Sequence, residues 1–361
     1  MQGHVSILSV SPEAAAMIAS GGRISTMDGT ADEIYANSLS AGQEKNEKLI
    51  GKVLSSGHTS VLEHCYVNLS FENVSVLAEQ FLIEFRLASF TVKSRRYVDF
   101  SKAGYVSPVF TANVQMAIFE RTVESLFGTY DVLEAAGVPK EDARFVLPYC
   151  FCSNFFCSMN ARELVHVMNE LAYGRGSRIP ELRALGESLF AQCEQQIPFL
   201  AVRKPEAYRQ SDAFCLRQVQ LLTSKAPVTV LAAPQDAEGL ICGAYQLARG
   251  NVPQPLTKPE QTALLKVLLA QPRKRELEQA SYTLLFGGLS LAALTHLTRH
   301  RMQALCAPNL LKSARYDRYV LPESVQQTGL EAKYREAFWQ AGEAAVQLRA
   351  AGAGEDVLSY L

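Results

Sequence analysis

The stretch Leu62-Glu63-His64-Cys65-Tyr66 decides the architecture, because a related stretch recurs as Leu277-Glu278-Gln279-Ala280-Ser281. In each case an arginine follows 24 residues after the leucine, at Arg86 and at Arg301. An offset of 214 or 215 residues also relates two further pairs of segments: Tyr105-Val106-Ser107-Pro108 with Tyr319-Val320-Leu321-Pro322, and 142–147 with 356–361. The chain therefore contains an internal repeat, whose halves we call copy one and copy two.

The copies differ at one triplet, which reads Glu84-Phe85-Arg86 in copy one and Arg299-His300-Arg301 in copy two. Apolar residues at helical spacing precede or enter the triplet in each copy: Leu77, Phe81 and Phe85, and Leu291, Leu294 and Leu297. The triplet is therefore predicted to lie at the C-terminal end of a buried helix. Cations are favourable at such an end. The alternative is a binding site for phosphates, or for a ring that becomes anionic when it is reduced.

The bulk composition is that of an ordinary soluble globular protein. A chain of 361 residues with 48% hydrophobic residues suggests two domains or a fused pair, and the net charge of -1 argues against nucleic acid as a partner. The N-terminus lacks the basic and apolar blocks of a signal peptide. The longest apolar stretch, Tyr282–Leu297, is shorter than a membrane span and predicts a buried helix. We therefore expect a cytoplasmic protein without a membrane segment.

The cysteines show no sign of a secreted or metal-binding protein. Eight cysteines without a secretory context indicate a reduced compartment. Cys150, Cys152 and Cys157 alternate with aromatic residues and lack the Cys-x-x-Cys spacing of a metal site. They are predicted to be packed core thiols, and no metal site is expected.

The hydrophobic patterns predict an α+β fold of two related units, each a small β-sheet packed by long helices. The first unit spans 1–210 and the second 226–361. Strands are predicted over 5–10, 66–71 and 228–233, and helices over 74–84, 114–136, 161–171, 180–195 and 333–350. Copy one carries about eight extra residues, which we assign to a polar surface loop within Met27–Glu44. Copy two ends at Leu361, the counterpart of Leu147, so we expect the second unit to be truncated.

Several polar residues are candidates for a site. Ser94-Arg95-Arg96-Tyr97 can place a hydroxyl and a guanidinium on one phosphate, or form a solvated basic turn. Arg144 precedes an apolar run and needs an anionic partner, either a carboxylate of the chain or a ligand. His58 is a loop histidine or a ligand contact, and Glu63 would be costly to bury without a donor. No catalytic triad, Gly-rich phosphate loop or metal-spaced histidine pair is present, so an organic cofactor is expected to carry any difficult step.

The ordered motifs resemble those of the flavin-dependent thymidylate synthases, the ThyX family. Gly57-His58-Thr59-Ser60-Val61-Leu62-Glu63-His64 is similar to the family's Gly-His-x-(Ser/Thr)-x-x-Glu-His element. The family signature is Arg-His-Arg, seven residues and then Ser, and Ser94 and Arg96-Tyr97 stand at the matching distance after Arg86. Three further elements match in order: Ala143-Arg144-Phe145-Val146-Leu147-Pro148, Asn160-Ala161-Arg162 and Glu181-Leu182-Arg183. The resemblance covers roughly 1–200 fully and 226–361 in part.

The resemblance implies a thymidylate synthase-complementing-protein-like fold and conversion of dUMP to dTMP. The implied carbon donor is methylenetetrahydrofolate, with FAD as cofactor and NADPH as reductant. It implies that dUMP is held by Ser94, Arg95, Arg96, Arg144 and Arg183, with Ser94 and Arg183 the catalytic candidates. It implies that FAD is held by His58, Ser60, Glu63, Arg86, Arg299, His300 and Arg301.

Each copy departs from the family pattern in a different place. Copy one has Glu84-Phe85 where the family has Arg-His, and copy two has Asn309, Leu311 and Leu358 where copy one has Ser94, Arg96 and Arg144. Because family sites are built from several subunits, we hypothesise hybrid sites with nucleotide contacts from copy one and flavin contacts from copy two. The chain is then expected to form a homodimer that acts as a pseudo-tetramer. The alternative is a catalytically inactive relative that binds nucleotide or serves as a scaffold.

Overall fold

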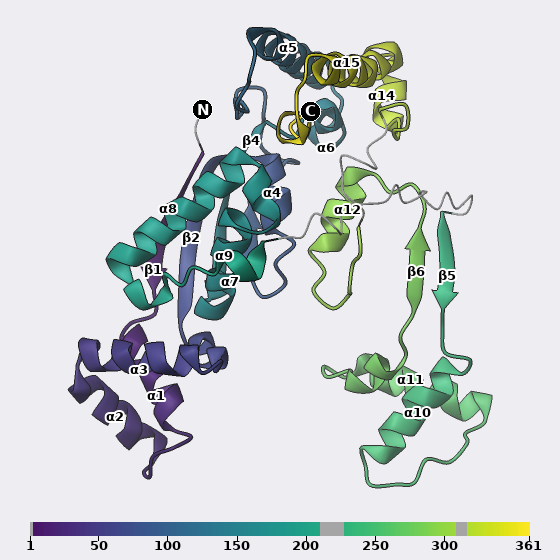
Figure 1. Cartoon of the computed structure of the whole chain (residues 1–361). Helices are drawn as coiled ribbons and strands as arrows, with labels where there is room; N and C mark the ends of the chain where they lie inside the picture. The colour runs from purple at the N-terminus through teal and green to yellow at the C-terminus, as the bar shows by residue number, and fades with distance from the viewer. Residues whose placement is uncertain (1–2, 210–226, 308–315) are drawn as a thin grey trace. The chain divides into compact units, whose positions relative to one another are not determined.

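The structure is a computed structural model that describes residues 3–209, 227–307 and 316–361. The chain forms two compact units (Figure 1). Unit 1 comprises Met1–Arg217 and Ala292–Leu361, and unit 2 comprises Gln218–Leu291. The C-terminal part of copy two therefore packs with copy one. The domain boundaries drawn from the repeat stay a prediction.

Unit 1 is built on a four-stranded antiparallel sheet. Its strands are β1 (His4–Val10), β2 (Tyr66–Ser75), β3 (Ser89–Val92) and β4 (Cys152–Asn160), in the order β1-β2-β4-β3. The period-two pattern that predicted a strand over 66–71 places Val67, Leu69 and Phe71 on the buried face. The α+β class is therefore confirmed.

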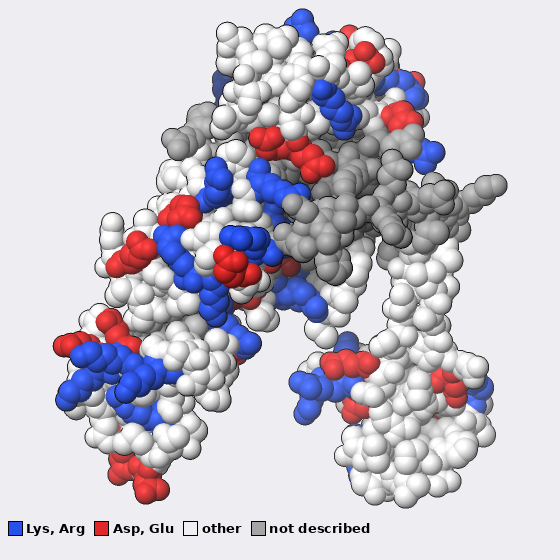
Figure 2. All heavy atoms as spheres, in the orientation of Figure 1, with Lys and Arg blue, Asp and Glu red and all other residues white. Residues whose placement is uncertain are grey.

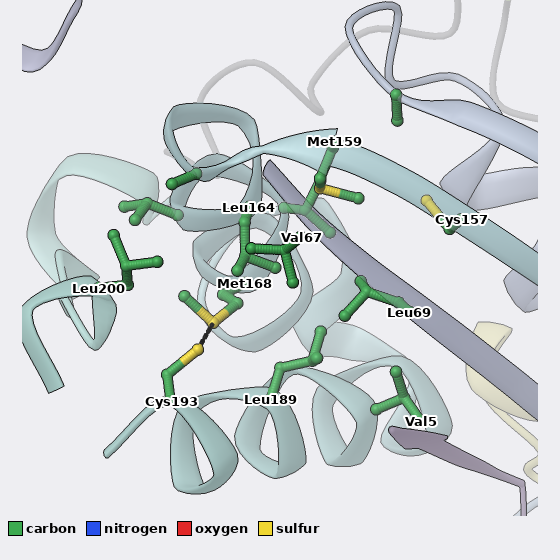
Figure 3. Close-up of a cluster of buried hydrophobic side chains, with 14 of the residues drawn as sticks. Val5, Val67, Leu69, Cys157, Met159, Leu164, Met168, Leu189, Cys193 and Leu200 are labelled. Atoms are coloured by element: carbon green, nitrogen blue, oxygen red, sulfur yellow. Dashed lines mark hydrogen bonds between the residues drawn. The ribbon is translucent and has the colours of Figure 1, made fainter. Parts of the chain in front are cut away.

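Two long helices cover one face of this sheet. They are α7 (Ala161–Ala172) and α8 (Pro180–Gln196), which pack against each other and enclose the main core. Figure 3 shows Met168 of α7 facing Cys193 of α8, with their sulfur atoms 3.7 Å apart, below Val67 and Leu69 of β2. Burial of this apolar surface is the dominant stabilising term of the unit.

Local signals start the helices at the expected residues. The Asn160 side chain accepts a hydrogen bond from the backbone N–H of Glu163 and caps α7, and Pro180 opens α8. Ser75 accepts from the N–H of Ala78 and caps α4 (Val76–Leu82). The helices predicted over 74–84, 114–136, 161–171, 180–195 and 333–350 are confirmed to within two residues at either end.

The predicted surface loop within Met27–Glu44 is wrong. This segment holds α2 (Ala31–Ala41), between α1 (Ala14–Arg23) and α3 (Gln43–Ser55). A capping box of Thr30 and Glu33 starts α2, and its buried face is formed by Ile34 and Ser38. Most of the surface of α2 faces solvent, so its sequence is polar and lacks the apolar periodicity from which a helix is predicted. The 3-10 helix η1 (Thr59–His64) then leads into β2.

Unit 2 repeats the start of copy one. The strands β5 (Val228–Ala232) and β6 (Thr283–Phe286) pair antiparallel, and α10 (Ala237–Leu247), α11 (Lys258–Ala270) and η6 (Arg275–Gln279) lie between them in the chain. Val228 pairs with Phe286, as Val5 pairs with Phe71 in copy one. The two ladders even share the same irregularity, which falls between Ile7 and Ser9 in one and between Val230 and Ala232 in the other.

The predicted buried helix over Tyr282–Leu297 is also wrong. The stretch contains β6, a turn and then α12 (Leu291–Thr298). Gly288 adopts a φ of +75°, which breaks the apolar run into a strand and a helix. None of the residues of α12 is buried in this structure. The triplet was predicted to lie at the C-terminal end of a buried helix. Its position is confirmed, because Arg299 comes directly after Thr298, but the predicted burial of that helix is wrong.

Residues related by the repeat contact each other inside unit 1. Thr295 Oγ1 donates to Gln80 Oε1 at 2.7 Å, Ser125 Oγ donates to Gln340 Oε1 at 2.7 Å, and Arg86 Nε donates to the Arg301 carbonyl at 3.1 Å. Each pair is 215 residues apart, which is the repeat offset. Contacts between equivalent residues are the mark of a twofold axis. The copies therefore pack about a pseudo-twofold axis, as two subunits of a dimer do.

The long helices of the two copies pack around this axis. They are α5 (Asn113–Ala135) and α15 (Glu331–Ala350), which lie side by side in Figure 1. Two smaller hydrophobic cores beside them contain residues of both copies, among them Tyr130 with Tyr334, and Val123 with Leu348. Copy two thus completes the packing of copy one.

The other described elements are short. They are α6 (Lys140–Ala143), η2 (Arg144–Val146), η3 (Arg175–Arg178), η4 (Pro198–Leu200), α9 (Pro205–Tyr208), α14 (Glu323–Gln327) and α16 (Glu355–Leu358). In the described part of the chain, no helix combines the length and the apolarity needed to cross a lipid bilayer.

Candidate functional site

A buried carboxylate lies between arginines of the two copies. Glu79 is 1% exposed on α4, and its carboxylate accepts a hydrogen bond from Ser153 Oγ at 2.6 Å. Arg95 of copy one forms an ion pair with it, and Arg299 of copy two approaches with Nη2 3.4 Å from Oε1. Helix α4 positions Glu79 because Ser75 starts the helix directly at the end of β2. A charge this deeply buried requires such partners.

Arg144 adds a cation that has no carboxylate partner among the described residues. It is half-buried on η2, donates from Nε to the Glu141 carbonyl at 3.0 Å and lies over the Phe145 ring. Burial lowers the pKa of Arg144, and so do the nearby charges of Arg95 and, less strongly, of Arg96 and Arg299. Arg144 was predicted to contact either a carboxylate of the chain or a ligand. Among the described residues no carboxylate forms a salt bridge with it, which favours the ligand contact.

His296 lies near these arginines and adds a further cation only when its ring is protonated. Its pKa is lowered, first by burial and then by the charges of Arg299, Arg144 and Arg96. We call Arg95, Arg96, Arg144, His296 and Arg299 the cation cluster. Glu79 is the carboxylate that pairs with its members, so the cluster keeps an excess of positive charge. Such an excess in a partly desolvated place favours an anionic ligand.

The chain after β3 forms the near side of the cluster. Ser94 Oγ accepts a hydrogen bond from the Arg96 backbone N–H at 3.3 Å, and the Val98 N–H donates to the Ser94 carbonyl at 3.1 Å. This turn holds Arg95 inward and leaves Arg96 exposed. Arg95 Nε is buried and has no hydrogen-bond partner among the described residues. The turn therefore offers a hydroxyl and donor groups beside one another.

The other two residues of the triplet lie near the start of β3. Arg301 Nη2 donates to the Ala88 carbonyl and to Ser89 Oγ, both at 2.7 Å, and His300 is exposed. Ser89 pairs with Ser158 on β4, which in turn pairs with Asn68 near the start of β2. Arg301 therefore lies toward the same end of the sheet as η1, which precedes β2.

The η1 candidates lie on the surface at that end. His58, Ser60 and Glu63 are exposed, and Glu63 forms an ion pair of 2.6 Å with Arg162 of α7. The carboxylate of Glu63 thus has the donor that its position was expected to need. Arg86 is also exposed and donates to the Arg301 carbonyl.

The structure brings together most of the residues predicted to bind the nucleotide, but not all of them. Arg95, Arg96 and Arg144 are members of the cation cluster, and Ser94 is hydrogen-bonded to Arg96. Arg183 lies exposed on the first turn of α8, and no hydrogen bond or ion pair within the described residues joins it to them. Its neighbour Glu181 instead accepts hydrogen bonds from Ser75 and Tyr360.

Two members of the site, Glu79 and His296, were not predicted from the sequence. Glu79 is the charged residue of the otherwise uncharged helix α4, which is a detectable signal. His296 stands 215 residues after Phe81, at the position where the family pattern has glutamine. An alignment of the two copies would have marked it.

The three cysteines predicted to be packed core thiols take no part in this site. Cys150, Cys152 and Cys157 are buried in the cores, so their prediction as packed thiols is confirmed. Burial raises the pKa of Cys152 to about 11 and that of Cys150 well above its usual value. Within the described residues no three His, Cys, Asp or Glu side chains are grouped as metal ligands would be.

The surface charge is mixed rather than one-sided. Figure 2 shows Lys and Arg side chains interspersed with Asp and Glu side chains on this face of the molecule. The cation cluster is a local feature of unit 1, in which the turn after β3, η2 and the end of α12 bring their cations near Glu79 of α4.

Both copies match a single protein family. The family described as thymidylate synthase complementing protein matches residues 6–199 and again 229–361. The chain therefore belongs to the thymidylate synthase complementing protein family, whose model matches it in two segments.

Characterised relatives carry the name flavin-dependent thymidylate synthase. The protein of Nitratidesulfovibrio vulgaris is 29% identical over 256 residues, which cover 68% of this chain and 96% of that protein. The protein of Geobacter sulfurreducens is 34% identical over 166 residues, which cover 45% of this chain and 70% of that protein.

Two solved structures are similar over 55% of this chain. One is the UMP/dUMP methylase PolB of Streptomyces cacaoi bound with 5-Br dUMP, with 21% identity, 93% of that chain covered and a TM-score of 0.46. The other is thymidylate synthase X of Helicobacter pylori with FAD and dUMP, with 22% identity, 96% of that chain covered and a TM-score of 0.43.

Replacing Glu79 by glutamine should destabilise unit 1. Glu79→Gln keeps the shape but leaves the guanidinium of Arg95, whose side chain is 11% exposed, without its counter-charge. Loss of one partner of a buried ion pair costs about 3–5 kcal/mol. The measurement is the free energy of unfolding in urea, followed by circular dichroism. The control is Glu63→Gln, which breaks an exposed ion pair and should cost less than about 1 kcal/mol. Equal losses in the two variants would contradict this account of Glu79.

Anion binding should strengthen as the pH falls, through His296. In the free protein the pKa of His296 is lowered, so the ring is neutral at pH 7. A bound anion favours the protonated ring and raises this pKa, so affinity rises as the pH drops between the bound-state and free-state pKa values. The measurement is sulfate affinity against pH by calorimetry, with a slope of at most about tenfold per pH unit.

His296→Gln should remove that component of the pH dependence, while His300→Gln, a change in a neighbouring histidine, should preserve it. A pH profile unchanged by His296→Gln would show that the ring does not face the anion.

Proposed function

We propose that this chain is a flavin-dependent thymidylate synthase that converts dUMP to dTMP. The observation that carries the proposal is the cation cluster, in which Arg95, Arg96 and Arg144 of copy one meet Arg299 of copy two. Membership of the family supports the reaction class. The cluster supports an anionic substrate bound between the copies, as the hybrid-site hypothesis requires.

The nucleotide phosphate is proposed to bind Ser94, Arg96 and Arg144. Arg144 lacks a carboxylate partner in the described chain, and Arg96 is exposed beside it, so both guanidinium groups are available for bidentate contacts. Glu79 holds Arg95 and Arg299 in place and offsets part of their charge. The family resemblance assigned Arg299 to FAD, and we propose instead that its charge contributes to the nucleotide site. His296 is placed to hydrogen-bond a polar edge of the substrate. Arg183 stays a candidate that would have to reach the substrate from the first turn of α8.

FAD is proposed to lie along the triplet of copy two. Arg86, His300 and Arg301 give a positive surface that suits an anionic cofactor, and Arg301 is anchored on β3. His58, Ser60 and Glu63 are proposed to meet it from η1, toward the same end of the sheet. FAD supplies the redox chemistry when bound. The described buried thiols, whose pKa values are raised, do not offer a thiolate nucleophile.

The remaining co-substrates follow from the family resemblance. Methylenetetrahydrofolate is the proposed carbon donor and NADPH the proposed reductant. Their binding residues are not assigned to particular side chains of this chain.

The hybrid-site proposal predicts separate losses for the two ligands. Arg96→Ala should weaken dUMP binding by about 10- to 100-fold, since a hydrogen bond to a charged group contributes roughly 1.5–3 kcal/mol. His300→Ala should release FAD, measured as loss of bound yellow flavin on desalting.

The matched controls are Arg209→Ala, a change in an exposed arginine on the segment after α9, and His4→Ala on β1. Both should leave the two ligands bound. If neither Arg96→Ala nor His300→Ala alters binding, the hybrid site is refuted.

The active form is proposed to be a homodimer that acts as a pseudo-tetramer. The internal pseudo-twofold axis supports this, because one chain already pairs its copies as two subunits would. Sedimentation equilibrium should therefore give a mass of twice the 39.7 kDa chain. A monomer that retains full activity would refute the proposed assembly.

A second candidate is an inactive relative that binds nucleotide without turnover. Glu84-Phe85 in the triplet position of copy one favours it, because a carboxylate there opposes an anionic ligand. The two candidates differ in one assay. Formation of dTMP from dUMP, methylenetetrahydrofolate and NADPH by the FAD-loaded protein supports the enzyme, and dUMP binding without dTMP supports the relative.

A further inference from the structure

We propose that each chain holds a single nucleotide site, and that the repeat-related position is a closed joint in which Arg175 pairs with Glu84 and covers Phe81. This inference rests on the proposed function. It adds how many nucleotide sites each chain has and what occupies the repeat-related second position.

The pseudo-twofold axis defines where a second site would lie. Gln80 contacts Thr295 and Arg86 contacts Arg301, so around these residues each position of copy two has a mate in copy one 215 residues earlier. Glu84 is the mate of Arg299, and Phe81 is the mate of His296. Copy one therefore has an anion, Glu84, in place of Arg299, and an apolar ring, Phe81, in place of His296.

The Glu84 carboxylate is already neutralised inside the chain. Arg175 Nη1 lies 2.9 Å from Glu84 Oε2, and its Nε lies 3.7 Å from a carboxylate oxygen of Glu170. The guanidinium carbon lies 5.1 Å from the centre of the Phe81 ring, in a cation–π contact. We call Glu84, Arg175, Glu170 and Phe81 the closed joint. Its one cation has two carboxylate partners, so it has no charge to offer a phosphate.

At this second position, the copy-two counterparts of Ser94, Arg95, Arg96 and Arg144 carry no positive charge. The counterpart of Arg144 is Leu358, which is 6% exposed in a core shared with Cys150 and Tyr360. The sequence at the mates of Ser94, Arg95 and Arg96 reads Asn309-Leu310-Leu311, which lies outside the described residues. An apolar and acidic position repels a nucleotide phosphate, whereas the cation cluster attracts it.

The two positions also differ in what holds them together. The closed joint is stabilised without a ligand, because its one cation, Arg175, is paired with the carboxylates of Glu84 and Glu170. The cation cluster keeps uncompensated positive charge around Arg144, which a bound anion would neutralise. We therefore assign a structural role to the closed joint and a ligand-binding role to the cation cluster.

Calorimetric titration of the purified full-length protein with dUMP tests the inference. We expect one dUMP bound per chain with a single affinity. Two dUMP per chain would overturn this inference and leave the proposed function standing. No binding at all would overturn the proposed function and this inference with it.

Replacing each of the two mates, Glu84 and Arg299, by glutamine makes the test more specific. Glu84→Gln should leave the stoichiometry at one and change the dUMP affinity by less than about twofold, because the joint does not touch the nucleotide. Arg299→Gln should weaken dUMP binding by at least roughly 30-fold, since it removes a charged group of the site.

The Arg175→Met variant provides a second measurement if Glu84→Gln folds poorly. It should lower the melting temperature and leave dUMP binding within about twofold. A marked loss of dUMP affinity in Glu84→Gln or Arg175→Met, with the fold intact by circular dichroism, would place the joint in the nucleotide site and refute its structural role.

Discussion

The packing of the two copies about one pseudo-twofold axis is the constraint on which unit 1 depends. Gln80 meets its mate Thr295, and Ser125 meets its mate Gln340, so the end of copy two must lie against copy one. This pairing places α15 beside α5 and completes two of the hydrophobic cores. A helix pair of this kind buries apolar surface that neither copy buries alone.

Fusion of the copies removes the symmetry that a homodimer imposes on its two sites. In a symmetric dimer, a change in one site is a change in both. In this chain each copy has its own residue at the positions that the copies share, so Glu84 and Arg299 occupy equivalent places with opposite charge. One place gathers arginines around Glu79, and the other joins Glu84 to Arg175. The first arrangement satisfies the rule that buried charges are paired, and the second is a more exposed ion pair.

Much of the fold follows from sequence patterns. The repeat was recognised from matching segments, and β1, β2 and the long helices were predicted from alternation and helical spacing. The strands β3 and β4 were not predicted. The two errors have physical causes. The polar helix α2 lacks a wide apolar face because only Ile34 and Ser38 are buried, and Tyr282–Leu297 has the composition of a helix but is divided by Gly288.

The sequence by itself determined the duplication, the family resemblance and the set of candidate cations, because these are properties of residue order. Only the tertiary structure decided that Arg299 approaches Glu79, 220 residues away, and that Arg144 lacks a carboxylate in the described chain. It also decided that Glu84 is paired with Arg175. The reason is that long-range ion pairs depend on tertiary packing, between the copies for Arg299 and Glu79 and within copy one for Glu84 and Arg175, and no local pattern encodes that geometry.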